Sequence, residues 1–188
     1  MQLVFDDNQS FTLPIPRIFH SFFHEGMFPE CSACGKPLLN DETSYFIEKA
    51  YRKSEVIFEY AMCDECRSEI GEEISFESMM NLAEYFMEHG DLMLRKERLM
   101  QNFDNSVKPW LDECLFTGEK RTEIDDYQIC AECSGTNIVA SFLPFMISGN
   151  ATEEIQSLIS KQTRESFDKF TREVLNPPVD LKNIPILI

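Results

Sequence analysis

The fold of this chain is decided by two short stretches, Cys31-Ser-Ala-Cys34-Gly35-Lys36-Pro37 and Cys63-Asp-Glu-Cys66. Each stretch places two residues between its cysteines, a spacing that lets both sulfurs bind one metal ion. Four thiolates around one ion make a closed tetrahedral site, which is typical of structural zinc. The sequence therefore predicts a zinc ion that builds the fold and performs no reaction, held by Cys31, Cys34, Cys63 and Cys66.

The residues between the two pairs favour a β-hairpin. Tyr45–Tyr51 and Glu55–Met62 are rich in β-branched and aromatic residues, and the polar Arg52-Lys53-Ser54 joins them. The second strand leads directly into Cys63-Asp-Glu-Cys66, where no glycine follows and a helical turn is expected. The positive end of the helix dipole would stabilise the thiolates there.

A glycine-bearing knuckle, a hairpin and a ligand pair at the start of a helix together resemble the treble-clef zinc finger. Rubredoxins and zinc ribbons are less similar, because their second pair also lies on a glycine-bearing knuckle. The resemblance covers the segment from the first cysteine pair to the helix. It implies a fold without implying a function.

A later segment repeats parts of this unit. Cys114-Leu-Phe-Thr117-Gly118-Glu-Lys120 parallels the first knuckle, and Tyr127-Gln-Ile-Cys130-Ala-Glu-Cys133 parallels Tyr60-Ala-Met-Cys63-Asp-Glu-Cys66. We therefore predict a second treble-clef-like module with a shortened hairpin. Thr117 stands at the position of Cys34, and a neutral hydroxyl is a poor zinc ligand.

The second module leaves three outcomes open for its remaining cysteines, Cys114, Cys130 and Cys133. The module is degenerate and held by packing, or a histidine from elsewhere completes a second zinc site, or an open zinc position holds water. The third outcome is the route to metal catalysis. The candidates for the completing ligand are His20, His24 and His89.

Helices are predicted outside the two modules. Ser75 can cap a helix that ends at Gly90, and Leu92 to Phe103 is expected to be helical as well. In the first of these helices, apolar residues recur at helical spacing and are expected to lie in the core. They are Phe76, Met79, Met80, Ala83, Phe86 and Met87.

The C-terminal part adds one more predicted helix and an apolar tail. Asn150-Ala-Thr-Glu153 has the form of a capping box, and Pro177-Pro178 would end the helix that it opens. The tail from Asn183 to Ile188 is apolar enough to dock on the body or on a partner. The helix is expected to turn one side to the core, formed by Ile155, Leu158, Ile159, Phe167, Phe170 and Val174.

The predicted fold class is α+β, with tandem treble-clef-like zinc modules packed against additional helices. Residues 1–30 form an N-terminal extended segment that packs on the core, and residues 31–105 contain the module with four cysteines. Residues 106–188 contain the degenerate module, the C-terminal helix and the tail.

Charge and composition limit the classes of partner. The chain has 17 basic and 33 acidic residues, a net charge of −16, which disfavours nucleic acid. The N-terminus has no secretory signal pattern, and no apolar run approaches the roughly 20 residues that span a bilayer. We therefore expect a protein of the reducing cytoplasm, where paired cysteines favour metal over disulfides.

No catalytic constellation is recognisable. None of the three histidines lies in a nucleophile motif, and no phosphate-binding loop or dinucleotide fingerprint is present. The leading hypothesis is a zinc-stabilised, non-enzymatic protein-interaction or adaptor protein. The alternatives are a nucleic-acid-linked regulatory zinc finger, and a hydrolase or redox enzyme that uses the incomplete second site; iron is the alternative metal.

Overall fold

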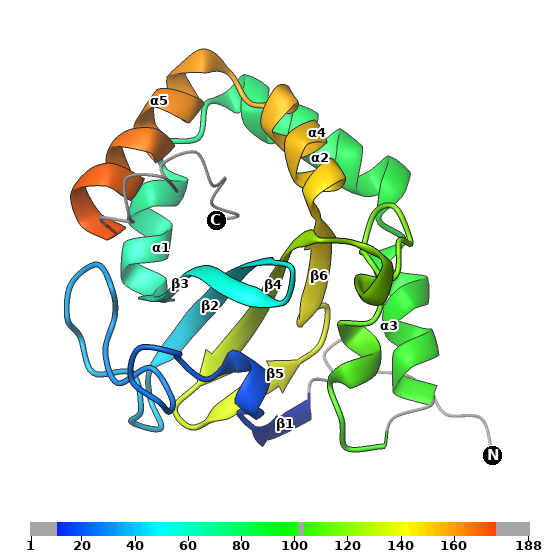
Figure 1. Ribbon diagram of the computed structural model, residues 1–188. Helices are drawn as coiled ribbons and strands as arrows, with labels where there is room; N and C mark the ends of the chain where they lie inside the picture. Colours follow the sequence, from blue (N-terminus) through cyan, green and yellow to red (C-terminus); the bar gives the residue numbers. More distant parts are fainter. Residues whose placement is uncertain (1–10, 102–103, 176–188) are drawn as a thin grey trace.

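The computed structural model describes residues 11–101 and 104–175. Within them one sheet contains six strands, in the order β1-β5-β4-β2-β3, with β6 paired to β4 off this path. Their bounds are β1 Phe11–Pro14, β2 Ser44–Arg52, β3 Glu55–Cys63, β4 Asp126–Ser134, β5 Asn137–Ala140 and β6 Phe145–Ser148. With the helices described below, the chain is an α+β protein (Figure 1).

The predicted hairpin is confirmed. Strands β2 and β3 pair antiparallel from Tyr45 opposite Cys63 to Arg52 opposite Glu55, with one register shift after Ala50. On its other edge β2 pairs antiparallel with β4 along its whole length. The sheet therefore joins the segments that carry the first and the second cysteine clusters. Strand β2, which lies between β3 and β4, is buried at all but its two end residues.

Five α-helices lie in the described residues: α1 Asp64–Gly71, α2 Phe76–His89, α3 Leu92–Gln101, α4 Gly149–Leu158 and α5 Lys161–Phe170. The first helix packs on β2 and β3, and α4 packs on β4 and β6. In Figure 1, α1, α5, α4 and α2 form an arch above the sheet, and α3 lies to one side. Shorter turns are η1 Arg17–Phe19, η2 Lys108–Trp110, η3 Arg121–Glu123 and η4 Thr171–Leu175.

The core lies around the sheet and combines aromatic with aliphatic side chains. Its largest fully buried side chains are Trp110, Tyr45, Tyr60, Phe19, Leu38, Ile47, Met62, Leu111, Ile129, Ile138, Met146 and Ile147. The burial of these apolar side chains is the main favourable contribution to folding.

The N-termini of α2 and α5 cap each other. Ser75 is the N-cap of α2 and Ser160 is the N-cap of α5. The Ser75 N–H donates to Thr163 Oγ1 at 2.9 Å, and the Ser160 N–H donates to Ser78 Oγ at 2.8 Å. Each helix thus satisfies a backbone donor at the start of the other, which fixes their relative position.

The structure corrects two helix predictions. The apolar stripe of α2 was expected in the core, but Phe76, Met79, Met80 and Met87 are exposed. The inward side of α2 carries Ser78 and Tyr85 instead, because the reciprocal caps turn the serine towards α5. The stripe therefore faces solvent.

The single C-terminal helix that the sequence predicts is two helices. Helix α4 starts after the N-cap Ser148, two residues before the predicted box, and the chain is extended at Ile159 before Ser160 caps α5. The predicted helix stop at Pro177-Pro178, the apolar tail and Phe103 lie outside the described residues.

Candidate metal centre

The first knuckle is a tight turn stabilised by its own backbone. The Cys31 N–H donates to the Lys36 carbonyl at 2.8 Å, and the Gly35 N–H donates to the Cys31 carbonyl at 2.9 Å. Gly35 has φ of +74°, and no atom lies within 4 Å of where a Cβ would stand. The glycine is therefore needed for its backbone conformation rather than for space.

The second cysteine pair joins strand to helix. Cys63 ends β3 and is the N-cap of α1, so that Cys66 lies in the first turn of that helix. The Ser32 N–H donates to the Ala61 carbonyl at 2.8 Å, and the Cys63 N–H points at Cys31 Sγ, 3.4 Å away. The knuckle is therefore docked on the end of β3.

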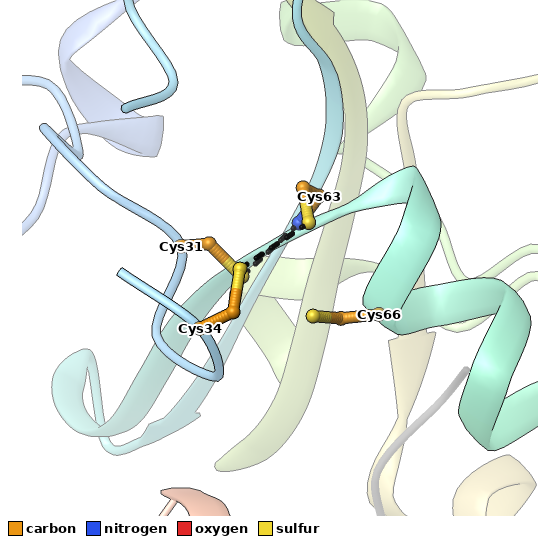
Figure 2. Close-up of side chains that lie close together, drawn as sticks. All are labelled: Cys31, Cys34, Cys63 and Cys66. Carbon is orange, nitrogen blue, oxygen red and sulfur yellow. Dashed lines mark hydrogen bonds between the residues drawn. The ribbon is translucent and has the colours of Figure 1, made fainter. Parts of the chain in front are cut away.

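These contacts bring the four predicted sulfurs together, as Figure 2 shows. Their Sγ atoms all lie within 4.8 Å of one another, and Cys34 Sγ is 3.8 Å from Cys63 Sγ. A tetrahedral zinc with Zn–S bonds of about 2.3 Å separates its sulfurs by about 3.8 Å. The set therefore has the size of a zinc site, and Cys31, Cys34, Cys63 and Cys66 form one group that could hold a metal.

The local environment lowers the pKa of one cysteine in the group and raises the pKa of two others. Burial raises the pKa of Cys31, but N–H donors from Cys63, Cys34 and Ala33 outweigh it and lower the pKa overall. Burial raises the pKa of Cys63 to about 11 and raises that of Cys66 as well. Metal binding at this group therefore has to release protons from thiols.

A second knuckle in the other half has the same backbone hydrogen bonds. The Cys114 N–H donates to the Glu119 carbonyl at 2.8 Å, and the Gly118 N–H donates to the Cys114 carbonyl at 3.0 Å. Gly118 has φ of +69°, close to that of Gly35. The Leu115 N–H donates to the Met146 carbonyl at 2.8 Å, which docks this knuckle on the end of β6.

The residue that meets this second knuckle is Ser148. It ends β6, is the N-cap of α4, and points its N–H at Cys114 Sγ, 3.3 Å away. Its Oγ lies 3.5 Å from Thr117 Oγ1, where the first half has the 3.8 Å contact between Cys34 and Cys63. Three residues further on, the place corresponding to Cys66 holds Ala151.

Cys130 and Cys133, which the sequence analysis matched with Cys63 and Cys66, do not lie at this second knuckle. Both are buried inside β4, where Cys130 is opposite Glu48 and Cys133 is opposite Tyr45 of β2. Residues three apart on a strand point to opposite faces, so the two sulfurs cannot share an ion with Cys114. Burial raises the pKa of Cys133 to about 12 and also raises that of Cys130.

The structure therefore does not bring Cys114, Cys130 and Cys133 together. In residues 11–101 and 104–175, the group of four described above is the one set of cysteine, histidine or acidic residues suited to a metal. The three histidines predicted as alternative fourth ligands do not join the cysteines of the second knuckle in such a group. His20 Nε2 contacts the Ile15 carbonyl at 3.1 Å, His89 Nδ1 contacts the Tyr85 carbonyl at 3.1 Å, and His24 is exposed.

Sequence reasoning missed Ser148 because the similarity it followed, Tyr-x-x-Cys-x-Glu-Cys, falls in the interior of β4 instead of at a strand end. A better signal is present. Phe145-Met-Ile-Ser148-Gly-Asn-Ala151 is an apolar run followed by a helix start, as is Tyr60-Ala-Met-Cys63-Asp-Glu-Cys66.

Comparisons with known proteins identify no relative. No protein-family model, curated protein or solved structure matches the chain. In the described part of the chain, no helix is long and apolar enough to cross a membrane.

Proposed function

We propose that this chain is a zinc-stabilised, non-enzymatic protein-interaction or adaptor protein built on two treble-clef-like modules. The first module binds one structural zinc through its four cysteines. The second is a degenerate copy that needs no metal. A reducing compartment such as the cytoplasm suits its seven unpaired cysteines.

The duplication is supported by pairs of matching contacts. The β2–β3 register places Tyr45 opposite Cys63, and the β4–β6 register places Tyr127 opposite Ser148. The two knuckles, their docking bonds and the two helices that follow match in the same way. A closed set of four sulfurs supports a structural ion, because catalytic zinc sites keep a position for water.

The observation that carries the interaction role is a set of large apolar side chains exposed on ordered elements. Phe22 and Phe23 are 76% and 90% exposed at the tip of the loop between Ser21 and Gly26, which pair as a β-bridge. Exposed apolar groups of this size on a soluble protein mark binding sites for other proteins.

The loop is held in place from beneath. Glu59 accepts hydrogen bonds from Ser21 Oγ at 2.7 Å, from the Phe22 N–H at 2.8 Å and from the Phe23 N–H at 3.3 Å. Lys49 forms a buried ion pair with Glu59 at 3.1 Å and also donates to the His20 carbonyl. A tip that is already ordered loses little conformational entropy when a partner binds.

Affinity capture under zinc-replete conditions tests this proposal. We expect the wild-type protein to retain at least one specific partner at stoichiometric yield, verified by cross-linking, and a control variant at an exposed helix position, Lys161→Ala, to retain it too. Zinc-depleted protein should lose the partner, because the fold that presents the surface is lost. Recovery of no specific partner by the zinc-loaded protein would contradict the interaction role.

A further inference from the structure

Besides the Phe22–Phe23 loop, helix α2 exposes an apolar stripe within the described part of the chain. We use the term α2 stripe for Phe76, Met79, Met80, Ala83 and Met87. Phe76 is 73% exposed, Met79 and Met80 are each 52% exposed, and Met87 is 85% exposed. The spacing of three and four residues aligns all five along one side of the helix.

The fold itself does not require an apolar residue at these positions. The reciprocal caps match Ser75 with Ser160 and Ser78 with Thr163. In the same register Asn81 of α2 matches Ser166 of α5. Asn81 donates a hydrogen bond to the end of α4, and Ser166 donates one to Glu73, which follows α1. In this register each position of the stripe corresponds to a position on α5 or η4. The matching residues are all charged: Lys161, Arg164, Glu165, Asp168 and Arg172.

The two helices thus share one architecture and differ at the surface. The α5 and η4 residues at these positions are exposed, like those of the stripe. Charge is the ordinary choice at a solvent-facing helix position, and a run of Phe and Met is not. Methionine is common where a surface packs against helices of other proteins.

An acidic row borders the stripe along one edge. Glu77, Glu84 and Glu88 are exposed, and their spacing of seven and four residues places them together beside the apolar residues. Helix α2 contains no lysine and no arginine. A partner that covers the stripe therefore meets three carboxylates on one side.

We propose that the α2 stripe binds an amphipathic helix of another protein, one that carries an apolar face and lysine or arginine residues along one edge. The proposal rests on the interaction function above and adds to it a second surface and a partner class. Charge complementarity selects this occupant, since basic residues would pair with the glutamate row. A second copy would bring another row of glutamates and another net charge of −16.

Fluorescence anisotropy with the full zinc-loaded chain tests the proposal. The probe is a designed helical peptide with leucine at positions i, i+3, i+4 and i+7 and lysine along one edge. The control peptide carries glutamate at the lysine positions. We expect saturable binding of the lysine peptide and at least about tenfold weaker binding of the glutamate peptide.

The variants transfer the surface of α5 to α2. The double variant Met80→Glu and Met87→Arg installs the residues found at the matching positions and should weaken lysine-peptide binding at least about tenfold. Because both positions face solvent, its thermal midpoint should stay near that of the wild type, which shows that it folds. The matched control, Glu165→Ala with Arg172→Ala, should bind as the wild type does.

Several outcomes overturn the proposal. These are equal binding of the two peptides, unchanged binding by the double variant, and affinity for phosphatidylcholine vesicles that the double variant abolishes. Self-association of the free chain through the stripe would make a second copy the occupant, and a large gain in affinity on deleting residues 176–188 would make the tail the occupant. If the double variant still retains the partner from affinity capture while Phe22→Ala with Phe23→Ala loses it, the interaction function stands and the α2 stripe does not.

Discussion

The two knuckles of this molecule share a backbone and differ in what holds it. Both turns close with the same two hydrogen bonds, both place glycine at positive φ, and both dock on a strand that runs into a helix. The first surrounds its centre with four sulfurs, whereas the second has one sulfur, two hydroxyls and a methyl group. Those second-half residues are Cys114, Thr117, Ser148 and Ala151.

Apolar packing is found at the second knuckle, which lacks three of the four sulfurs of the first. Leu115 is buried where the first knuckle has the exposed Ser32, and the fully buried Met146 stands at the place of Ala61. Ala151 is fully buried, whereas Cys66 is partly exposed. If the first turn binds the proposed zinc, the comparison teaches that the same turn can be stabilised by a metal or by side-chain packing further inside.

The largest expected effect is the loss of a first-module ligand. Cys63→Ser should abolish zinc binding and with it binding free energy on the order of 10 kcal/mol, so that cooperative folding is lost. The matched change, Ser148→Ala, removes an N-cap and should lower the free energy of unfolding by about 1 kcal/mol. Metal analysis and thermal unfolding of both variants measure the difference. Similar losses in the two variants would break the comparison.

The second prediction restores the missing ligands. Thr117→Cys, Ser148→Cys and Ala151→Cys together with the native Cys114 reproduce the first ligand set on a backbone of the same form. We expect this triple variant to bind one more zinc ion per chain than the wild type, measured by native mass spectrometry. Adding Cys114→Ser to the triple variant should remove the extra ion. A triple variant that folds and gains no zinc would show that the two turns are not equivalent.

Alanine at each knuckle glycine has a smaller effect. Neither Gly35 nor Gly118 has an atom near its added Cβ, so the cost is that of positive φ, about 1 kcal/mol at each position. For a chain of this length each variant should lower the thermal midpoint by about 2–4 °C. If Gly35→Ala lowers the thermal midpoint and Gly118→Ala leaves it unchanged, the second turn does not depend on this conformation.

The smallest effect concerns Glu119, whose carboxylate accepts from Thr117 Oγ1 at 2.7 Å and from Asn150 Nδ2 at 3.1 Å. Hydrogen bonds from Ser148 and Thr117 lower the pKa of Glu119 below its ordinary 4.5. A lowered folded-state pKa means that its small contribution to stability is present above pH 4.5 and is lost as pH falls through the lowered value. Thr117→Val should move the pKa of Glu119 upward in an NMR titration. An unchanged pKa of Glu119 would contradict the claim that these hydroxyl groups stabilise its carboxylate.

The parts of the structure that sequence reasoning found are those that short-range patterns specify. The spacing of Cys31, Cys34, Cys63 and Cys66, the hairpin between the pairs and the Ser75 cap all follow from residues close in sequence. The strand partner of the second knuckle does not. In the chain, β5 and the segment after it lie between β4 and β6. The residue that corresponds to Cys63 is therefore Ser148 at the end of β6, and the pairing of β6 with β4 cannot be predicted from a local pattern.

The prediction that the α2 stripe lies in the core was wrong for a related reason. Helical spacing of Phe76, Met79, Met80 and Met87 indicates that one side is apolar, but not which side faces the core. The inward side is set by hydrogen bonds to Ser160 and Thr163, far along the chain. Tertiary contacts of polar residues thus override the apolar pattern.

The most direct test of the central claim is the zinc content of protein purified without added metal, measured for the wild type, for Cys63→Ser and for Ser148→Ala. The account predicts one zinc per chain in the wild type, none bound tightly by Cys63→Ser, and one in Ser148→Ala. Two ions in the wild type, iron in place of zinc, or a metal content unchanged by Cys63→Ser would contradict it.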